Sequence, residues 1–179
     1  AEKAAEAVRL MGGQVLLIVP GRWEPAQLYA ELYANALETA RRVAGAVEES
    51  GITVGLENVD NGFLLSPSEW RRFLDETDHP RIRCYYDVGN TVYAGLGHPE
   101  QWIRELGRER ICRIHVKDAT RNRQLTALCE GEVRWPAVTA ALEEIGYDGW
   151  IGAELQLPAD DPLAFLRKIR RKLRDIWGL

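Results

Sequence analysis

Four short apolar runs of the sequence each end close to a side chain that can bind a divalent metal ion. These side chains are Glu57, Asp87, His115 and Glu154. Three carboxylates and one imidazole make a ligand set rich in hard oxygen atoms. Such a set suits Mn²⁺ or Mg²⁺ better than a structural zinc ion, which usually takes cysteine and histidine. The four residues therefore predict one divalent-metal site, provided that the fold brings them together.

The runs that carry these residues have the composition of buried β-strands. They span residues 52–56, 82–86, 111–116 and 150–153, and a fifth run without such a ligand spans residues 15–19. Helical periodicity or helix-start signals mark residues 1–11, 25–49, 99–107 and 136–145, and the segments that begin at Ser66 and Asp161. Strands that are apolar on both faces and alternate with helices indicate a parallel sheet covered by helices.

The segment that begins at Ser66 carries a strong helix-start signal. Ser66 can cap the helix, Pro67 suits its first turn, and Glu69 completes the pattern of a capping box. We therefore expect the helix to begin directly after Ser66.

Two architectures fit this alternation: an open doubly wound sheet and an eight-stranded (β/α) barrel. In both, the carboxyl ends of parallel strands meet at one edge, where active sites form. The ligand-type residues recur at roughly 30–40 residues, about one βα unit of a barrel. A complete barrel takes about 250 residues, whereas this chain has 179. The barrel interpretation makes the chain one domain, residues 1–179, that holds the last five βα units of eight and lacks three strands at the front.

Composition narrows the class of protein. Hydrophobic residues make up 46% and charged residues 28%, which is typical of a folded globular protein. The net charge of -4 argues against a nucleic-acid partner. No apolar run approaches the ~20 residues that cross a bilayer, and the start lacks a secretory pattern. Cys84, Cys112 and Cys129 do not pair off evenly, so we expect buried free thiols and a cytoplasmic protein.

Several motifs resemble the sugar phosphate isomerase/epimerase group of the xylose isomerase-like TIM-barrel superfamily, which includes ketose 3-epimerases. Four of them are Gly55–Asn58, Tyr86–Asn90, Ile114–Asp118 and Gly152–Glu154. The segment Glu130–Trp135 also resembles the Gly-Glu-Gly-x-Val-Asp-Trp loop that follows the seventh strand in this group. The resemblance covers most of the chain from residue 52 on. Its motifs are specific for the superfamily and not for one substrate.

The resemblance implies roles for individual residues. The metal ligands would be Glu57, Asp87, His115 and Glu154, and the catalytic acid/base pair would be Glu57 and Glu154. Mn²⁺ is the favoured ion, with Mg²⁺, Co²⁺ and Zn²⁺ as alternatives. The partner would be a small-molecule ketose or sugar phosphate, and the chain would self-associate if a second copy covers the open sheet edges.

Three further residues would contact the substrate. Asn90 falls where several ketose epimerases carry a histidine, and Arg121 falls near a substrate-binding arginine, with Arg123 as its alternative. Lys117 would contact a phosphate or carboxylate, or else pair with Asp118. Candidate sugar-facing aromatic residues, for which packing is the alternative role, are Trp23, Tyr85, Tyr86, Tyr93 and Trp135.

The implied reaction removes a proton from the carbon next to a ketose carbonyl and passes through an enediolate. Three alternatives stay open. A dehydratase of the inosose type would use related chemistry on the same scaffold and expel a hydroxyl group. A nuclease of the endonuclease IV type would need a histidine-rich trinuclear zinc site. The chain has three histidines, which is a small number for such a site. The last alternative is an inactive fragment of a barrel.

Overall fold

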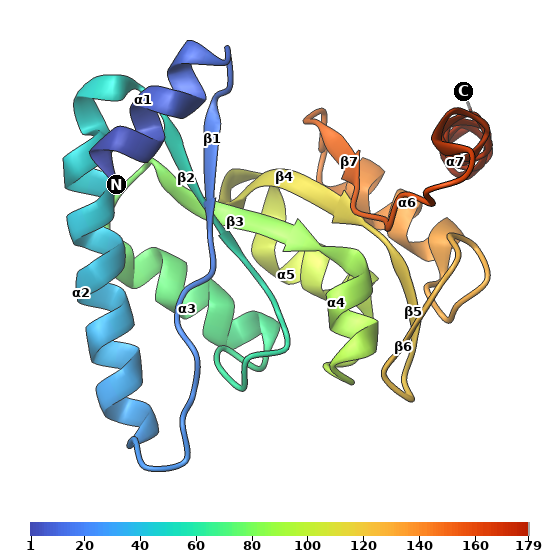
Figure 1. Cartoon of the computed structure of the whole chain (residues 1–179). Helices are drawn as coiled ribbons and strands as arrows, with labels where there is room; N and C mark the ends of the chain where they lie inside the picture. Colours follow the sequence, from blue (N-terminus) through green and yellow to red (C-terminus); the bar gives the residue numbers. More distant parts are fainter. Residues whose placement is uncertain (179) are drawn as a thin grey trace.

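The computed structural model describes residues 1–178, and its centre is a half barrel of five parallel strands (Figure 1). The strands lie in the order β1-β2-β3-β4-β7. Their bounds are β1 Val15–Ile18, β2 Thr53–Glu57, β3 Ile82–Asp87, β4 Ile111–Val116 and β7 Ile151–Ala153. Each neighbouring pair is parallel. The five predicted strands are therefore confirmed, with ends that differ from the prediction by at most one residue.

Helices lie between successive strands, before β1 and after β7, and they cover the outer side of the half barrel (Figure 1). They are α1 Glu2–Leu10, α2 Tyr29–Val47 with the short 3-10 helix η1 Glu48–Ser50, α3 Pro67–Thr77, α4 Val88–Tyr93, α5 Pro99–Arg110, α6 Trp135–Glu144 and α7 Pro162–Trp177. Among residues 1–178, no helix is long and apolar enough to cross a bilayer.

Alternation along the central strands separates the core from the site. Leu56, Tyr86 and Ile114 are buried on the helix side, against large side chains such as Trp70 and Trp102. Successive side chains of a strand point to opposite faces. The next residue in each strand, a predicted metal ligand, therefore faces the concave side of the half barrel.

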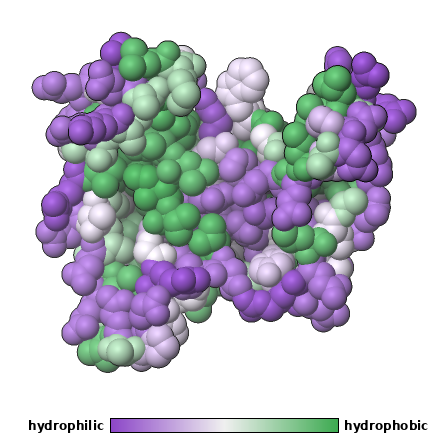
Figure 2. Space-filling model, viewed as in Figure 1, coloured by the Kyte–Doolittle hydropathy of each residue, from purple (hydrophilic) through white to green (hydrophobic). Residues whose placement is uncertain are grey.

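The two edge strands are less buried than the sequence predicts. Only the central strands β2, β3 and β4 are buried on most of their length, whereas β1 and β7 are largely intermediate or exposed. Leu17 and Val19 on the β1 side and Trp150 before β7 are exposed. Figure 2 shows hydrophobic residues gathered on the surface around α1 and β1. The prediction of strands apolar and covered on both faces is thus wrong for the edge strands, because the helices cover the outer side of the half barrel and leave its concave side open there (Figure 1).

Two elements near the site do not follow from the sequence patterns. Helix α4 begins directly after β3 and is only six residues long. Strands β5 (Asp118–Thr120) and β6 (Gln124–Thr126) form an antiparallel hairpin directly after Lys117. Both elements are too short to show helical or strand periodicity, which explains why the sequence prediction missed them.

The cysteines lie partly as expected. All three are free thiols, and Cys84 and Cys112 are buried in β3 and β4. Cys129 is exposed, so the expectation of a buried thiol is wrong at this position. It lies in the loop after the β5–β6 hairpin, outside the strands that bury the other two.

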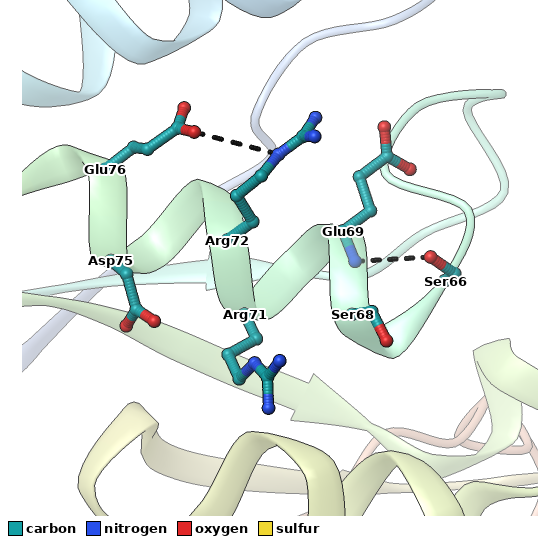
Figure 3. Close-up of a pocket in the computed structure, with 7 residues that line it drawn as sticks. All are labelled: Ser66, Ser68, Glu69, Arg71, Arg72, Asp75 and Glu76. Carbon is teal, nitrogen blue, oxygen red and sulfur yellow. Dashed lines mark hydrogen bonds and ion pairs between the residues drawn. The ribbon is translucent and has the colours of Figure 1, made fainter.

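Helix α3 begins where its sequence predicts. Ser66 is the N-cap, and its Oγ accepts a hydrogen bond from the Glu69 N–H at 3.2 Å (Figure 3). The Glu69 carboxylate accepts from the Leu65 N–H at 2.8 Å, one residue before the donor of a standard capping box. Tyr29 of α2 donates to the same carboxylate, which ties the start of α3 to α2.

Replacing Ser66 by alanine is expected to lower the free energy of unfolding by about 1 kcal/mol, because the N–H of Glu69 loses its acceptor. Ser68 is exposed on the same helix and donates to the Glu105 carboxylate at 3.2 Å, so it provides a control for the loss of an exposed hydrogen bond. Ser68→Ala should change stability by less than about 0.5 kcal/mol. Urea unfolding of the two variants measures the difference, and equal losses would show that the cap does not stabilise α3.

Candidate metal centre

The four predicted ligands meet at the carboxyl ends of the central strands and of β7. One ligand atom from each of Glu57, Asp87, His115 and Glu154 lies within 4.8 Å of all the others. Glu57 ends β2, Asp87 ends β3, His115 is the fifth residue of β4, and Glu154 follows β7. The parallel register aligns these strand ends, with Asp87 opposite His115. Their convergence is the decisive feature of the site.

Glu57 and Glu154 reach the site from strands on either side of β3 and β4. His115 Nδ1 lies 2.8 Å from Glu57 Oε1 and 3.7 Å from Glu154 Oε2. The Glu57 side chain is almost fully buried, whereas that of Glu154 is 49% exposed. The two carboxylates thus flank one imidazole, and one of them is open to solvent or to a ligand.

Asp87 is fixed by its neighbours before any ion binds. Its Oδ1 accepts the Asn90 N–H at 2.6 Å and so caps α4. Asn58 exchanges two hydrogen bonds with the Asp87 backbone, at 2.7 and 2.9 Å. The Asn90 side chain donates to the Asn58 carbonyl at 2.8 Å. Asn58 is a positioning residue without an assigned role in the sequence analysis, because its partners are 29 and more residues away.

The other oxygen of Asp87 has the environment of a metal ligand. Among the described residues, Asp87 Oδ2 is buried and accepts no hydrogen bond. Lys117 Nζ lies 3.3 Å away as an ion-pair partner, outside hydrogen-bond geometry. An unsatisfied buried carboxylate oxygen is costly, and an ion coordinated there would remove the cost. The donor set and this oxygen together fit a divalent cation.

Lys117 pairs with two of the ligands. Its Nζ lies 2.6 Å from Glu154 Oε2 and 3.3 Å from Asp87 Oδ2. The predicted alternative, an ion pair with Asp118, is wrong, because adjacent strand residues point to opposite faces. Gly89 permits this position of Lys117, since a Cβ at residue 89 would lie 2.4 Å from Lys117 Cγ.

These charges shift the protonation of the site. Burial raises the pKa of the Asp87 carboxyl, and the Lys117 ammonium and the Asn90 N–H oppose that rise. Burial also acts to raise the pKa of Glu154, but the hydrogen bond and charge of Lys117 outweigh it and the pKa is lowered. Burial acts to lower the pKa of Lys117, yet Asp87 and Glu154 raise it. Lys117 is therefore an ammonium that keeps Glu154 ionised.

Asp118 organises the loop beside the site. Its Oδ1 accepts the N–H groups of Ala119 and Val133, at 2.9 and 3.2 Å. Its Oδ2 accepts the N–H of Cys129 at 2.9 Å and the indole N–H of Trp135 at 3.0 Å. A Cβ at Gly131 would lie 2.2 Å from Asp118 Oδ1, so only glycine fits there. Asp118 thereby joins β5 to the 129–135 loop.

The remaining sequence-predicted residues lie around this centre. The Asn90 amide is buried and already donates to Asn58. Arg121 is exposed in the turn of the β5–β6 hairpin, where Nε lies 3.7 Å from Glu132 Oε2. Arg123, its alternative, pairs with Asp60 and lies over the Tyr93 ring. Of these three residues, Asn90 contacts one of the four ligands, through its backbone N–H to Asp87. Arg121 and Arg123 pair with other acidic residues.

The predicted aromatic residues separate into three groups. The Tyr85 ring lies on the concave face, with its centroid 4.2 Å from that of His115. Tyr86 and Trp135 are buried, which confirms packing roles for these two. Trp23 packs edge-on against the Tyr29 ring but is 46% exposed, and the Arg123 guanidinium lies over the Tyr93 ring. Tyr85 is therefore a predicted aromatic residue in ring contact with a proposed ligand.

Two pockets of the described residues are candidates for a substrate site, and the smaller of the two adjoins the ligands. A pocket of about 500 Å³ includes Lys117 and Glu154 in its wall. A larger one, of about 810 Å³, runs along the outer side of α3 (Figure 3). Its charged residues pair with each other or with neighbouring helices, as in the ion pairs of Arg71 with Glu105 and of Arg72 with Glu76. The larger pocket is thus a paired polar surface, and the smaller one belongs to the site.

Comparison with known proteins agrees with this geometry. The family model of the xylose isomerase-like TIM barrel matches residues 1–173. The chain belongs to this family. An inosose dehydratase of Geobacillus thermodenitrificans is 23% identical over 163 residues, which cover 80% of this chain and 54% of the dehydratase. The chain spans about half the length of the curated relatives that it matches over most of its own length.

Solved structures share this fold. A D-tagatose 3-epimerase-like protein superposes with a TM-score of 0.81 and 23% identity, over 98% of this chain and 67% of that one. The IolI protein, solved with a zinc atom, gives a TM-score of 0.86 and 15% identity, over 99% of this chain and 67% of that one. The five-stranded half barrel thus corresponds to about two thirds of these structures.

Proposed function

We propose that the chain carries the catalytic centre of a divalent-metal-dependent isomerase or epimerase acting on a sugar or sugar phosphate. The observation that carries this proposal is the convergence of Glu57, Asp87, His115 and Glu154 within 4.8 Å. The family match and the ketose epimerase-like structural neighbour support it. The zinc atom in IolI supports a metal at a site of this fold.

The four converging residues would hold the metal. Mn²⁺ fits best, because three of the four ligands are carboxylates, and Mg²⁺, Co²⁺ or Zn²⁺ are the alternatives. When bound, such an ion acts as a Lewis acid that stabilises negative charge on the substrate oxygens, an effect worth several kcal/mol. Asp87 Oδ2, which accepts no hydrogen bond, and the nearly buried Glu57 carboxylate favour binding of a cation at the site.

Glu57 and Glu154 are the proposed acid/base pair. They approach from strands on either side of β3 and β4, so a substrate carbon between them exposes one face to each carboxylate. One carboxylate removes the proton next to the carbonyl, and the other returns a proton to the enediolate. Lys117 keeps Glu154 ionised, which suits a base. Asn90, Lys117 and Arg121 stay proposed substrate contacts.

The half barrel is proposed to be the last five βα units of an eight-stranded barrel. The exposed apolar residues at both edge strands and the greater length of the relatives support this proposal. Three further strands would pair with β1 and β7 and enclose the concave face. Self-association of the chain and a cytoplasmic location stay predictions from the sequence.

An inosose dehydratase-type lyase is the second candidate, and the relative from Geobacillus thermodenitrificans favours it. Both reactions begin with removal of a proton next to a carbonyl, so the same two carboxylates would serve. The products differ, since a dehydratase expels a hydroxyl group as water.

Solvent exchange tests the proposal directly. The Mn²⁺-loaded protein, incubated in D₂O with a panel of ketoses, should incorporate deuterium next to the carbonyl of one of them and yield its epimer or isomer. Mass spectrometry detects the deuterium, and chromatography identifies the product. Loss of water from a cyclic keto-polyol in place of epimerisation would favour the lyase, and absence of exchange in every substrate would contradict both.

A further inference from the structure

The pocket that adjoins the metal centre has a composition that restricts its ligand. It measures about 500 Å³, within the usual range for small-molecule sites. It shares Lys117 and Glu154 with the centre, and it extends from them between the β5–β6 hairpin and the start of α7. A sugar whose reacting carbons lie at the four ligands would place its far end here.

Charge in the pocket wall is negative. Lys117 is the one cation among the nine described residues of the wall, which also include the carboxylates of Asp118 and Glu154. The ammonium of Lys117 is already paired with Glu154 and Asp87. With a divalent ion bound, Lys117 and the ion supply three positive charges against the three of Glu57, Asp87 and Glu154. Among the described residues of the wall and the four ligands, no positive charge is left over for a phosphate.

Three cations on the segments next to the pocket wall are held by anions. Arg121 pairs with Glu132, and Arg123 pairs with Asp60. Lys172 of α7 donates to the Leu128 carbonyl and pairs with Glu130 at 2.9 Å. Each of these side chains would have to leave an anion to reach a ligand in the pocket.

The nearest helix start does not offer an anion site either. Phosphates often bind at the N-termini of helices, where free N–H groups and the helix dipole favour negative charge. At α7, which contributes Phe165 to the pocket wall, the Asp161 carboxylate occupies this position and accepts the Ala164 N–H at 2.9 Å. A phosphate there would meet a carboxylate of the chain itself.

The rest of the wall is largely apolar. It consists of Leu125, Ala127, Leu155 and Phe165, with Thr126 and Gln156 as neutral polar residues. Aliphatic and aromatic side chains suit the C–H faces of a sugar, and the Gln156 amide suits hydroxyl groups, whereas the Thr126 hydroxyl is buried. A phosphate carries about -1.5 to -2 charges at neutral pH and needs several strong donors, whereas the described residues of the wall offer one, the already paired Lys117.

We propose that this pocket takes the uncharged far end of the sugar, so that the substrate is a free ketose and not a sugar phosphate. This inference rests on the proposed function. It narrows the substrate class, because the sequence motifs did not distinguish a free ketose from a sugar phosphate.

Calorimetric titration of the Mn²⁺-loaded protein tests the inference. The probes are matched pairs: D-fructose and D-fructose 6-phosphate, D-ribulose and D-ribulose 5-phosphate, and D-xylulose and D-xylulose 5-phosphate. We expect each free ketose that binds to do so at least tenfold more tightly than its phosphorylated partner. Tighter binding of any phosphorylated member would overturn the inference and leave the proposed function intact. Binding of no member, in protein shown to hold Mn²⁺, would overturn both.

A charge introduced into the wall provides the second arm. Leu125 is 59% exposed, so Leu125→Lys should leave the fold intact. The new ammonium should improve binding of the phosphorylated partners by about tenfold, since charge-assisted hydrogen bonds to phosphate are strong. Leu65→Lys, at an exposed leucine outside the wall, is the matched control and should change nothing. Equal phosphate affinity in wild type and Leu125→Lys would show that the wall charge does not select the ligand.

Discussion

Replacing Glu57 or Glu154 by glutamine is expected to lower the rate of epimerisation or isomerisation by about 10²–10⁴-fold, because each variant lacks one member of the acid/base pair. The two variants should differ in hydrogen exchange. Each keeps one carboxylate, which can still exchange the proton on the face of the substrate that it reaches. One variant should therefore exchange the proton next to the carbonyl of one epimer with deuterium from D₂O. The other variant should exchange the corresponding proton of the opposite epimer.

Deuterium incorporation into each epimer, measured at saturating Mn²⁺, distinguishes this arrangement from a single-base mechanism. Glu144→Gln, at an exposed glutamate on α6, is the control and should keep the wild-type rate. If both active-site variants lose exchange with the same epimer and keep it with the other, the two glutamates do not act on opposite faces.

Asp118→Asn is expected to destabilise the chain by about 2–5 kcal/mol, the largest stability change that we predict. The carboxylate accepts four N–H groups, two on each oxygen. An amide has one oxygen, so its NH₂ group must face two donors. Each buried donor left without an acceptor costs about 1–3 kcal/mol.

Urea unfolding measures this loss, with Asp160→Asn at an exposed position as the control. The control should change the free energy of unfolding by less than about 0.5 kcal/mol. If Asp118→Asn were as stable as the control, the four hydrogen bonds would not hold the 129–135 loop against β5.

The position of the four ligands at the carboxyl ends of apolar runs explains why they could be predicted from the sequence. In the three central strands, the buried residue before each ligand faces the helices, so the ligand itself faces the other side. Leu56 and Glu57 show this pattern, as do Tyr86 and Asp87. Because parallel strands end at one edge, the strand pattern alone brings these side chains together.

The surroundings of the ligands depend on contacts between distant segments, which no local pattern encodes. Asn58 holds the backbone of Asp87, and Gly89 makes room for Lys117. Asp118 is an exception that alternation could have revealed, since its side chain must point away from that of Lys117. The wrong Lys117–Asp118 pair came from considering their charges without their directions in the strand.

The most direct test of the central claim is thermal unfolding of the chain with and without excess Mn²⁺. A ligand at 100 times its Kd stabilises the folded state by about 2.7 kcal/mol. For a chain of this size that is a rise in Tm of about 5–10 °C. His115→Ala should abolish the rise, whereas His79→Ala, at a histidine in the loop before β3, should preserve it. Cooperative unfolding with the same Tm in the presence and absence of Mn²⁺ would contradict the metal centre.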